Sequence, residues 1–192
     1  MKNLLTAAAL IIFAMPVIGG DIHGKVVARG LSDSADAVVY VAKIAGKTFA
    51  PPAAHAKIDQ RNLRFIPHVL PVLAGTTVDF LNSDPVLHNV FSPDACADHV
   101  NLGTWPQGQA KSFTFKKDCF AALLCKIHPE MEGFVAALPT PYFAVTGADG
   151  SYLIKDVPDG YYTLKVWHPR LKAAQKKVDV KGATKADFEI AK

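Results

Sequence analysis

The sequence lacks several patterns that mark common classes of protein. No apolar residues recur at helical spacing over a long stretch, and no cluster of Lys and Arg is interleaved with aromatic residues. Charged residues are only 20% of the 192 residues and the net charge is only +4, so we expect no nucleic-acid partner. No phosphate-binding glycine loop, Ser/His/Asp set or supported carboxylate pair occurs, so we do not expect an enzyme.

The chain instead has the composition of β-strands. Short runs rich in Val, Ile, Phe, Tyr and Thr alternate with Gly, Pro, Asn and Asp turns, which is typical of an all-β protein. Residues 69–82 show the pattern, because two apolar runs flank an Ala-Gly-Thr turn. With 50% hydrophobic residues, the chain is long enough for one or two packed domains.

The N-terminal residues 1–20 have the pattern of a secretory signal. Lys2 precedes an apolar run from Leu4 to Met15, and Pro16 and a pair of glycines follow. The run is shorter than the stretch of about 20 apolar residues that spans a bilayer, so we expect cleavage near Asp21 rather than an uncleaved anchor. The mature chain is then periplasmic or secreted, with no membrane span.

Four metal-binding side chains form the most informative motif. Cys125, His128 and Met131 fall on one short loop, and His88 lies upstream in a Leu-His-Asn-Val-Phe-Ser run. A thiolate, two imidazoles and a thioether are the ligand set of a blue-copper site, in which a long axial thioether bond accompanies a trigonal Cys-His-His arrangement. Zinc also binds Cys and His, but a thioether argues against it. We therefore expect one copper ion (Cu⁺/Cu²⁺) with no open position for a substrate.

Two cysteines remain once Cys125 is assigned to the metal. In an oxidising compartment, a structural disulfide between Cys96 and Cys119 is the plainer interpretation. The alternative is a second metal site formed by Cys96, His99 and Cys119, because Cys-x-x-His is a ligand spacing. One short spacing is a weak signal, so we expect the disulfide.

The segment from about Lys57 to Leu138 resembles the cupredoxins, the type 1 blue-copper proteins that include amicyanin and plastocyanin. The resemblance lies in the Cys-x2-His-x2-Met spacing, the upstream His-Asn-Val, and a strand-turn motif at Gly75, Thr76, Val78, Phe80, Asn82 and Asp84. It implies a Greek-key β-sandwich in which the four side chains above bind copper. It also implies that Asn89 ties the first histidine strand to the cysteine loop by hydrogen bonds.

A second resemblance covers residues 143–167. They are similar to the later strands of a carboxypeptidase-regulatory-like, or transthyretin-like, β-sandwich. The matching positions are Asp149, Gly150, Tyr152, Gly160, Tyr162, Leu164 and Val166. Asp149-Gly150 and Asp159-Gly160 each predict a hairpin turn.

A half-sandwich of this length cannot close its own core, so we expect its first strands at residues 22–30 and 37–42. The predicted organisation is a cupredoxin domain at residues 54–139, inserted in a sandwich formed by residues 21–53 plus 140–192. The alternative is sequential, with residues 21–139 as the cupredoxin and residues 140–192 as an appendage.

We therefore expect an exported carrier of single electrons. The resemblance implies that His128 reaches the surface within an apolar patch, where a redox partner such as a c-type cytochrome or a dehydrogenase docks weakly. Two alternatives remain open: a copper chaperone or storage protein, and an envelope-binding module with an accessory copper site. After Met15 the only methionine is Met131, and the lack of a methionine-rich tract argues against the first alternative.

Three further residues could be mistaken for part of a site. We expect His68 to be structural, with a role near the metal as the alternative. Trp105 and Trp167 are expected to be packing residues, because a buried indole contributes mainly apolar area.

Overall fold

The computed structural model describes residues 19–192 and is all-β, as the composition predicts. Among these residues, the one helical element is the short 3-10 turn η1 (Ala95–Ala97). Within residues 19–192, no helix is long and apolar enough to cross a bilayer. The predicted signal peptide lies outside the described residues except for Gly19 and Gly20, which begin the first strand.

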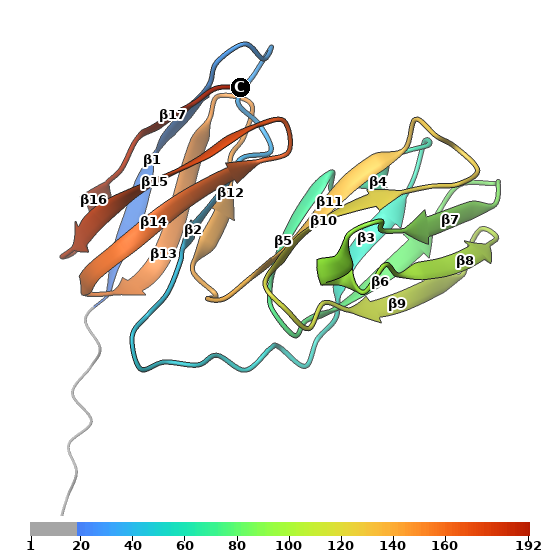
Figure 1. Ribbon diagram of the computed structural model, residues 1–192, viewed down its shortest axis with the longest axis horizontal. Coiled ribbons are helices and arrows are strands. Elements are labelled where there is room, and N and C mark those ends of the chain that lie inside the picture. Colours follow the sequence, from blue (N-terminus) through green and yellow to red (C-terminus); the bar gives the residue numbers. More distant parts are fainter. Residues whose placement is uncertain (1–18) are drawn as a thin grey trace, which may run out of the picture.

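One pair of sheets, which we call the flanking sandwich, contains both ends of the described chain (Figure 1). One sheet has the order β13-β1-β16, with β17 also paired to β1, and the other has the order β12-β2-β14-β15. The strands are β1 (Gly19–Ala28), β2 (Val38–Val41), β12 (Phe143–Val145), β13 (Ser151–Pro158), β14 (Gly160–His168), β15 (Leu171–Val180), β16 (Thr184–Lys185) and β17 (Phe188–Ile190).

The other pair of sheets, which we call the central sandwich, is built from the middle of the chain (Figure 1). Its sheets have the orders β5-β11-β10-β7-β8 and β4-β3-β6-β9. The strands are β3 (Ala56–Gln60), β4 (Phe65–Ile66), β5 (Val69–Leu73), β6 (Thr77–Asn82), β7 (His88–Phe91), β8 (Asn101–Trp105), β9 (Ala110–Thr114), β10 (Cys119–Leu124) and β11 (Glu132–Leu138).

The strands form because apolar residues recur at the two-residue period of a pleated chain. In β10, Cys119, Ala121 and Leu123 are buried while the residues between them are half-buried. A separate apolar core fills each sandwich. Each sandwich therefore has the means to hold its two sheets together.

A third apolar cluster lies where the two sandwiches meet. Tyr40 of β2 and Trp167 of β14 contribute from the flanking sandwich. Phe120 of β10 and Phe134 of β11 contribute from the central sandwich. Trp167 packs in this cluster, so its expected packing role places it between the sandwiches.

The two Asp-Gly turns do not form the hairpins that the sequence predicts. Asp149-Gly150 joins β12 to β13, and Asp159-Gly160 leads from β13 into β14, but in each case the joined strands belong to different sheets. A glycine is needed at Gly150, because its φ is +77° and a Cβ would lie 2.1 Å from the carbonyl oxygen of Val26. The turn chemistry reverses the chain, but it does not determine that the two strands pair.

Candidate metal centre

Three of the predicted ligands converge in the central sandwich. The Nδ1 atoms of His88 and His128 are 3.1 Å apart, and the Sγ of Cys125 is 3.9 Å from Nδ1 of His128. One ligand atom from each of the three residues lies within 4.8 Å of the others. Because metal bonds to imidazole nitrogen and thiolate sulfur are about 2.0–2.3 Å long, these separations fit three ligands around a single ion.

The loop between β10 and β11 supplies three of the four predicted side chains. Leu124 and Glu132 pair across the ladder and close the loop at its base. The Met131 N–H donates to the His128 carbonyl oxygen at 3.0 Å, which tightens the turn. The Met131 side chain is buried in the same apolar core as Cys125. A buried thioether here is available as the axial ligand that the sequence predicts.

His88 is fully buried at the start of β7, and its second ring nitrogen is hydrogen-bonded. The Nε2 of His88 is 2.9 Å from a carboxylate oxygen of Asp84. A carboxylate only accepts, so Nε2 carries the proton and the Nδ1 lone pair faces the other ligands. A carboxylate that orients a histidine in this way fixes its tautomer and increases its basicity toward a metal.

Asp84 is also the acceptor for the β3–β4 turn. Its carboxylate accepts the backbone N–H groups of Asn62 at 2.6 Å and Leu63 at 2.9 Å. Both turn residues have positive φ, 54° and 56°, which is unfavourable for leucine. Burial alone raises the pKa of the Asp84 carboxyl, but the hydrogen bonds from Leu63, His88 and Asn62 together lower it. The group is therefore an anion that joins the turn to the histidine.

Sequence reasoning did not assign a site role to Asp84. Asp84 was named only as the last residue of a strand-turn motif. Its contact with His88 depends on how the loop before β7 folds. Asn82 shapes that loop, because its side chain donates to the carbonyl oxygens of Val86 and Trp105 and accepts from the Asp84 N–H. The signal available in sequence was an acid four residues before a predicted ligand.

Asn89 connects β7 with the loop, as the resemblance implies. Its backbone N–H donates to the Cys125 sulfur at 3.4 Å, and its side-chain oxygen accepts from the Lys126 N–H at 3.3 Å. Its side-chain nitrogen donates to Asn101 and Gly103 of β8. The Cys125 sulfur therefore receives one backbone hydrogen bond. The loop is held to β7 both at this sulfur and at the Lys126 N–H.

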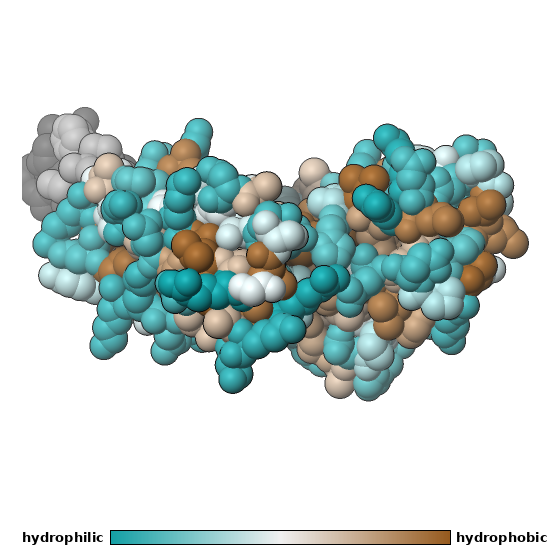
Figure 2. All heavy atoms as spheres, turned by 90° about the horizontal axis from the view of Figure 1, so that it is seen from above, coloured by the Kyte–Doolittle hydropathy of each residue, from teal (hydrophilic) through white to brown (hydrophobic). Residues whose placement is uncertain are grey.

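Large apolar side chains are exposed next to both histidines in the sequence. Val86 and Leu87 precede His88, and Ile127 precedes His128; they are 43%, 52% and 42% exposed. Figure 2 views the molecule from above and shows hydrophobic side chains at the surface of the right-hand half, where the central sandwich lies.

The predicted disulfide is confirmed. Cys96 of η1 and Cys119 of β10 are bonded, with 5.6 Å between their Cα atoms. The alternative second metal site is wrong, because both thiols are used and the His99 ring bonds to the carbonyl oxygen of Pro93. His68 is not among the converging ligands; it pairs with Asp36 of the flanking sandwich at 2.6 Å.

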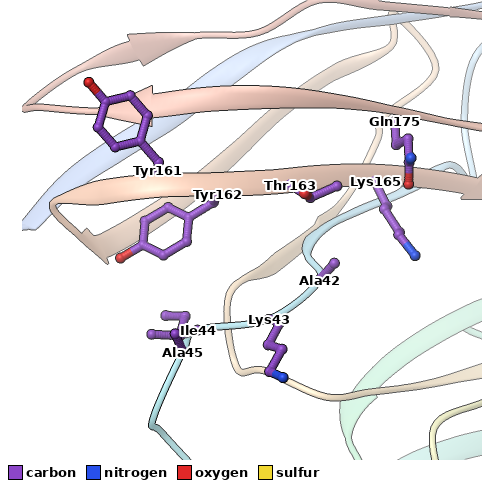
Figure 3. A pocket seen from close by; sticks show the side chains of 9 residues that line it. All are labelled: Ala42, Lys43, Ile44, Ala45, Tyr161, Tyr162, Thr163, Lys165 and Gln175. Carbon is purple, nitrogen blue, oxygen red and sulfur yellow. The ribbon is translucent and has the colours of Figure 1, made fainter.

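A separate groove of about 660 Å³ lies on the flanking sandwich (Figure 3). Its lining residues come from β14, β15 and the segment after β2: Ala42, Lys43, Ile44, Ala45, Tyr161, Tyr162, Thr163, Lys165 and Gln175. None of these side chains is a thiolate, an imidazole or a thioether. The groove is therefore not part of the metal centre.

Comparisons with known proteins give distant structural matches. No protein-family model matches the chain, and no curated protein matches it. A purple cupredoxin from Nitrosopumilus maritimus is 25% identical over 43% of this chain and 98% of its own, with a TM-score of 0.40. A reduced amicyanin mutant is 23% identical over 52% of this chain and 97% of its own, with a TM-score of 0.41.

A copper-containing nitrite reductase from Thermus scotoductus SA-01 is also similar, at 23% identity and a TM-score of 0.43. The match covers 52% of this chain and 25% of the reductase. At such TM-scores the likeness does not determine what this chain does. The functional assignment therefore depends on the side chains of the metal centre.

Proposed function

We propose that this protein carries single electrons through one type 1 copper ion. The observation that supports this most directly is the convergence of a buried thiolate with two imidazole nitrogens, 3.1 Å apart. Thiolate and imidazole ligands also suit zinc, but together with the Met131 thioether they favour copper. When bound, copper would supply the Cu⁺/Cu²⁺ couple at a site whose protein ligands are held before the ion arrives.

The surrounding residues act by limiting movement of the ligands. Asp84 holds His88 through Nε2, and Asn89 holds Lys126 next to the thiolate. Both holding residues are buried, so water does not compete for these hydrogen bonds. A ligand set that moves little between two charge states is what one-electron transfer needs, because less reorganisation accompanies each transfer.

We propose that the protein is not an enzyme. Cys125, His88, His128 and Met131 together would occupy all positions around the ion. The Met131 side chain is buried, so no solvent-filled space lies at its position. Catalytic metal sites keep a position for substrate or water, and this ligand set offers none.

We propose that a redox partner docks weakly at the histidine end of the central sandwich. His128 is only partly buried, and the exposed side chain of Ile127 precedes it. Replacing Ile127 with Glu is expected to slow transfer to a c-type cytochrome or a dehydrogenase without changing the copper colour. Stopped-flow kinetics with each candidate partner measure this, and unchanged rates with all partners would move the docking site elsewhere.

We also propose that residues 54–139 form the copper domain, inserted within a second domain, and that the chain is exported. The strand pairings support the insertion. β1 pairs with β13 and β2 pairs with β14, and the whole central sandwich lies between the paired strands in the sequence. The Cys96–Cys119 disulfide supports an oxidising compartment, either the periplasm or the exterior.

The experiment that tests the function is titration of the purified apoprotein with Cu²⁺, followed by visible absorption. We expect an intense thiolate-to-copper band that saturates at one equivalent, bleaches with mild reductant and is absent in Cys125→Ser. A pale spectrum would contradict the electron-carrier proposal. Rapid loss of copper to a weak chelator would instead favour the chaperone or storage role.

A further inference from the structure

Both strands that flank the metal loop also face the flanking sandwich. β10 leads into the loop at Cys125, and β11 leads out of it after Met131. Phe120 lies on the first strand and Phe134 on the second, and both belong to the apolar cluster between the sandwiches. Figure 1 shows the end of the β14–β15 hairpin directed toward these two strands.

Trp167, at the end of β14, contacts both strands at once. Its ring stacks on Phe120 with centroids 4.5 Å apart and planes 16° apart. It also meets Phe134 edge-on at 5.8 Å. Aromatic pairs at these distances contribute beyond the area they bury. One side chain of the flanking sandwich therefore packs against both strands that lead to and from the loop.

Two further contacts hold the outgoing strand. Phe134 donates its N–H to the His68 carbonyl oxygen at 2.8 Å, and the His68 ring pairs with Asp36 of the flanking sandwich. Glu132, the residue after the predicted axial ligand, lies 4.0 Å from Arg170 in the β14–β15 turn. The second pair is exposed and contributes little to stability.

We propose that Trp167 is a positioning residue for the metal loop, and that the flanking sandwich serves as its rigid support. The expected effect on copper affinity rests on the proposed copper function. The expected effect on the rigidity of the loop concerns the apoprotein alone. A seven-residue loop keeps ligand geometry only if the strands at its base are fixed. Here the fixing contacts lie five residues before Cys125 and three residues after Met131.

The test compares Trp167→Ala with Leu164→Ala, which is on the same strand but points into the core of the flanking sandwich. Leu164→Ala removes buried apolar volume without touching β10 or β11, so it controls for a general loss of stability. Trp167→Phe keeps a ring at the contact, and Trp167→Leu replaces Trp167→Ala if that variant does not fold. All are studied as the full mature chain.

The first measurement is amide hydrogen exchange in the apoprotein. We expect the Met131 amide to exchange about tenfold faster in Trp167→Ala than in the wild type, with wild-type rates in Leu164→Ala and near-wild-type rates in Trp167→Phe. The second is copper affinity by chelator competition, where Trp167→Ala is expected to raise Kd by about tenfold, the size of effect seen for groups that orient ligands.

Equal effects of Trp167→Ala and Leu164→Ala would overturn the positioning role, as would wild-type exchange and affinity in Trp167→Ala. Failure of the copper proposal is distinguishable from these results. In that case the wild type shows no thiolate-to-copper band, while the exchange comparison in the apoprotein still decides whether Trp167 holds the loop.

Discussion

The two sandwiches share an architecture but bury different chemistry. Among the described residues, seven of the ten buried polar side chains lie between residues 54 and 139: Gln60, Thr76, Asn82, Asp84, His88, Asn89 and Ser92. The other three, Thr140, Thr146 and His168, lie in the flanking sandwich and hydrogen-bond to its own backbone. A buried polar group costs free energy unless it is hydrogen-bonded, so its presence in a core calls for a reason.

For three of these seven side chains, the reason is visible in their positions. Asn82 holds the loop that places Asp84, Asp84 holds His88, and Asn89 holds the cysteine loop. Each is within hydrogen-bond reach of a predicted ligand or of a residue that fixes one. The comparison teaches that the buried polar side chains of the flanking sandwich connect its own segments, whereas Asn82, Asp84 and Asn89 connect the segments that carry the predicted ligands.

The largest expected loss of stability comes from a substitution in the apolar core of the flanking sandwich. Leu164→Ala removes a fully buried side chain of the flanking sandwich and is expected to lower its free energy of unfolding by about 2–5 kcal/mol. The copper spectrum should not change, because no polar group near the ligands is touched. Urea unfolding followed by tryptophan fluorescence measures the stability, and visible absorption of the copper-loaded protein measures the spectrum. A spectral change would break the separation between the two cores.

The next effect concerns the polar network. Asp84→Asn removes a charged acceptor that three N–H groups share, and we expect a loss of about 1–3 kcal/mol in stability. Copper should bind about 10–100-fold more weakly, because His88 loses its orienting group. Chelator competition measures the affinity. Asp79→Asn on the outer side of β6 is the control, and equal effects of both variants would remove the special role of Asp84.

How much of this could be read from sequence differs between the two sandwiches. The loop ligands were predictable because three of them lie within one turn between strands, so chain connectivity alone brings them together. The disulfide followed from the odd cysteine count. The ligand role of Met131 stays a prediction. Asp84 was not assigned because its partner depends on a loop shaped by Asn82, and Trp167 was placed only as packing because its neighbours are distant in sequence.

At the Asp-Gly turns, by contrast, the sequence predicts hairpin pairing that the structure does not contain. Asp149-Gly150 has the composition of a tight turn, and the structure contains one, with the Asp149 side chain accepting from the Ser151 N–H at 3.0 Å. The flanking strands nevertheless pair with β2 and β1 rather than with each other. Local chemistry determines a reversal, whereas strand partners follow from which faces must be buried together.

A smaller effect is expected from Asn89→Ala, which sharpens the comparison within the polar network. It removes the acceptor of the Lys126 N–H and the donor to Gly103, so we expect a loss of about 0.5–1.5 kcal/mol and faster exchange of the Lys126 amide. Asn101→Ala is the matched control, since it removes one partner of Asn89 but leaves the bond to the loop. Unchanged Lys126 exchange in Asn89→Ala would show that the cysteine loop does not need this tie.

The smallest effect belongs to the contact between the two sandwiches and appears as a dependence on pH. The hydrogen bond from His68 lowers the pKa of the Asp36 carboxyl, so the folded state favours its anion. This contribution to stability is present above the unfolded pKa of about 3.9 and is lost as pH falls through the lower, folded value. Asp36 has a φ of 64°, which Asn also tolerates, so Asp36→Asn removes the charge without backbone strain. Urea unfolding at pH 7 and pH 3 should show a smaller loss of stability in Asp36→Asn than in the wild type, while Asp33→Asn in the same segment keeps the wild-type difference. If Asp36→Asn loses as much as the wild type, acid acts on the sandwiches separately and not on their contact.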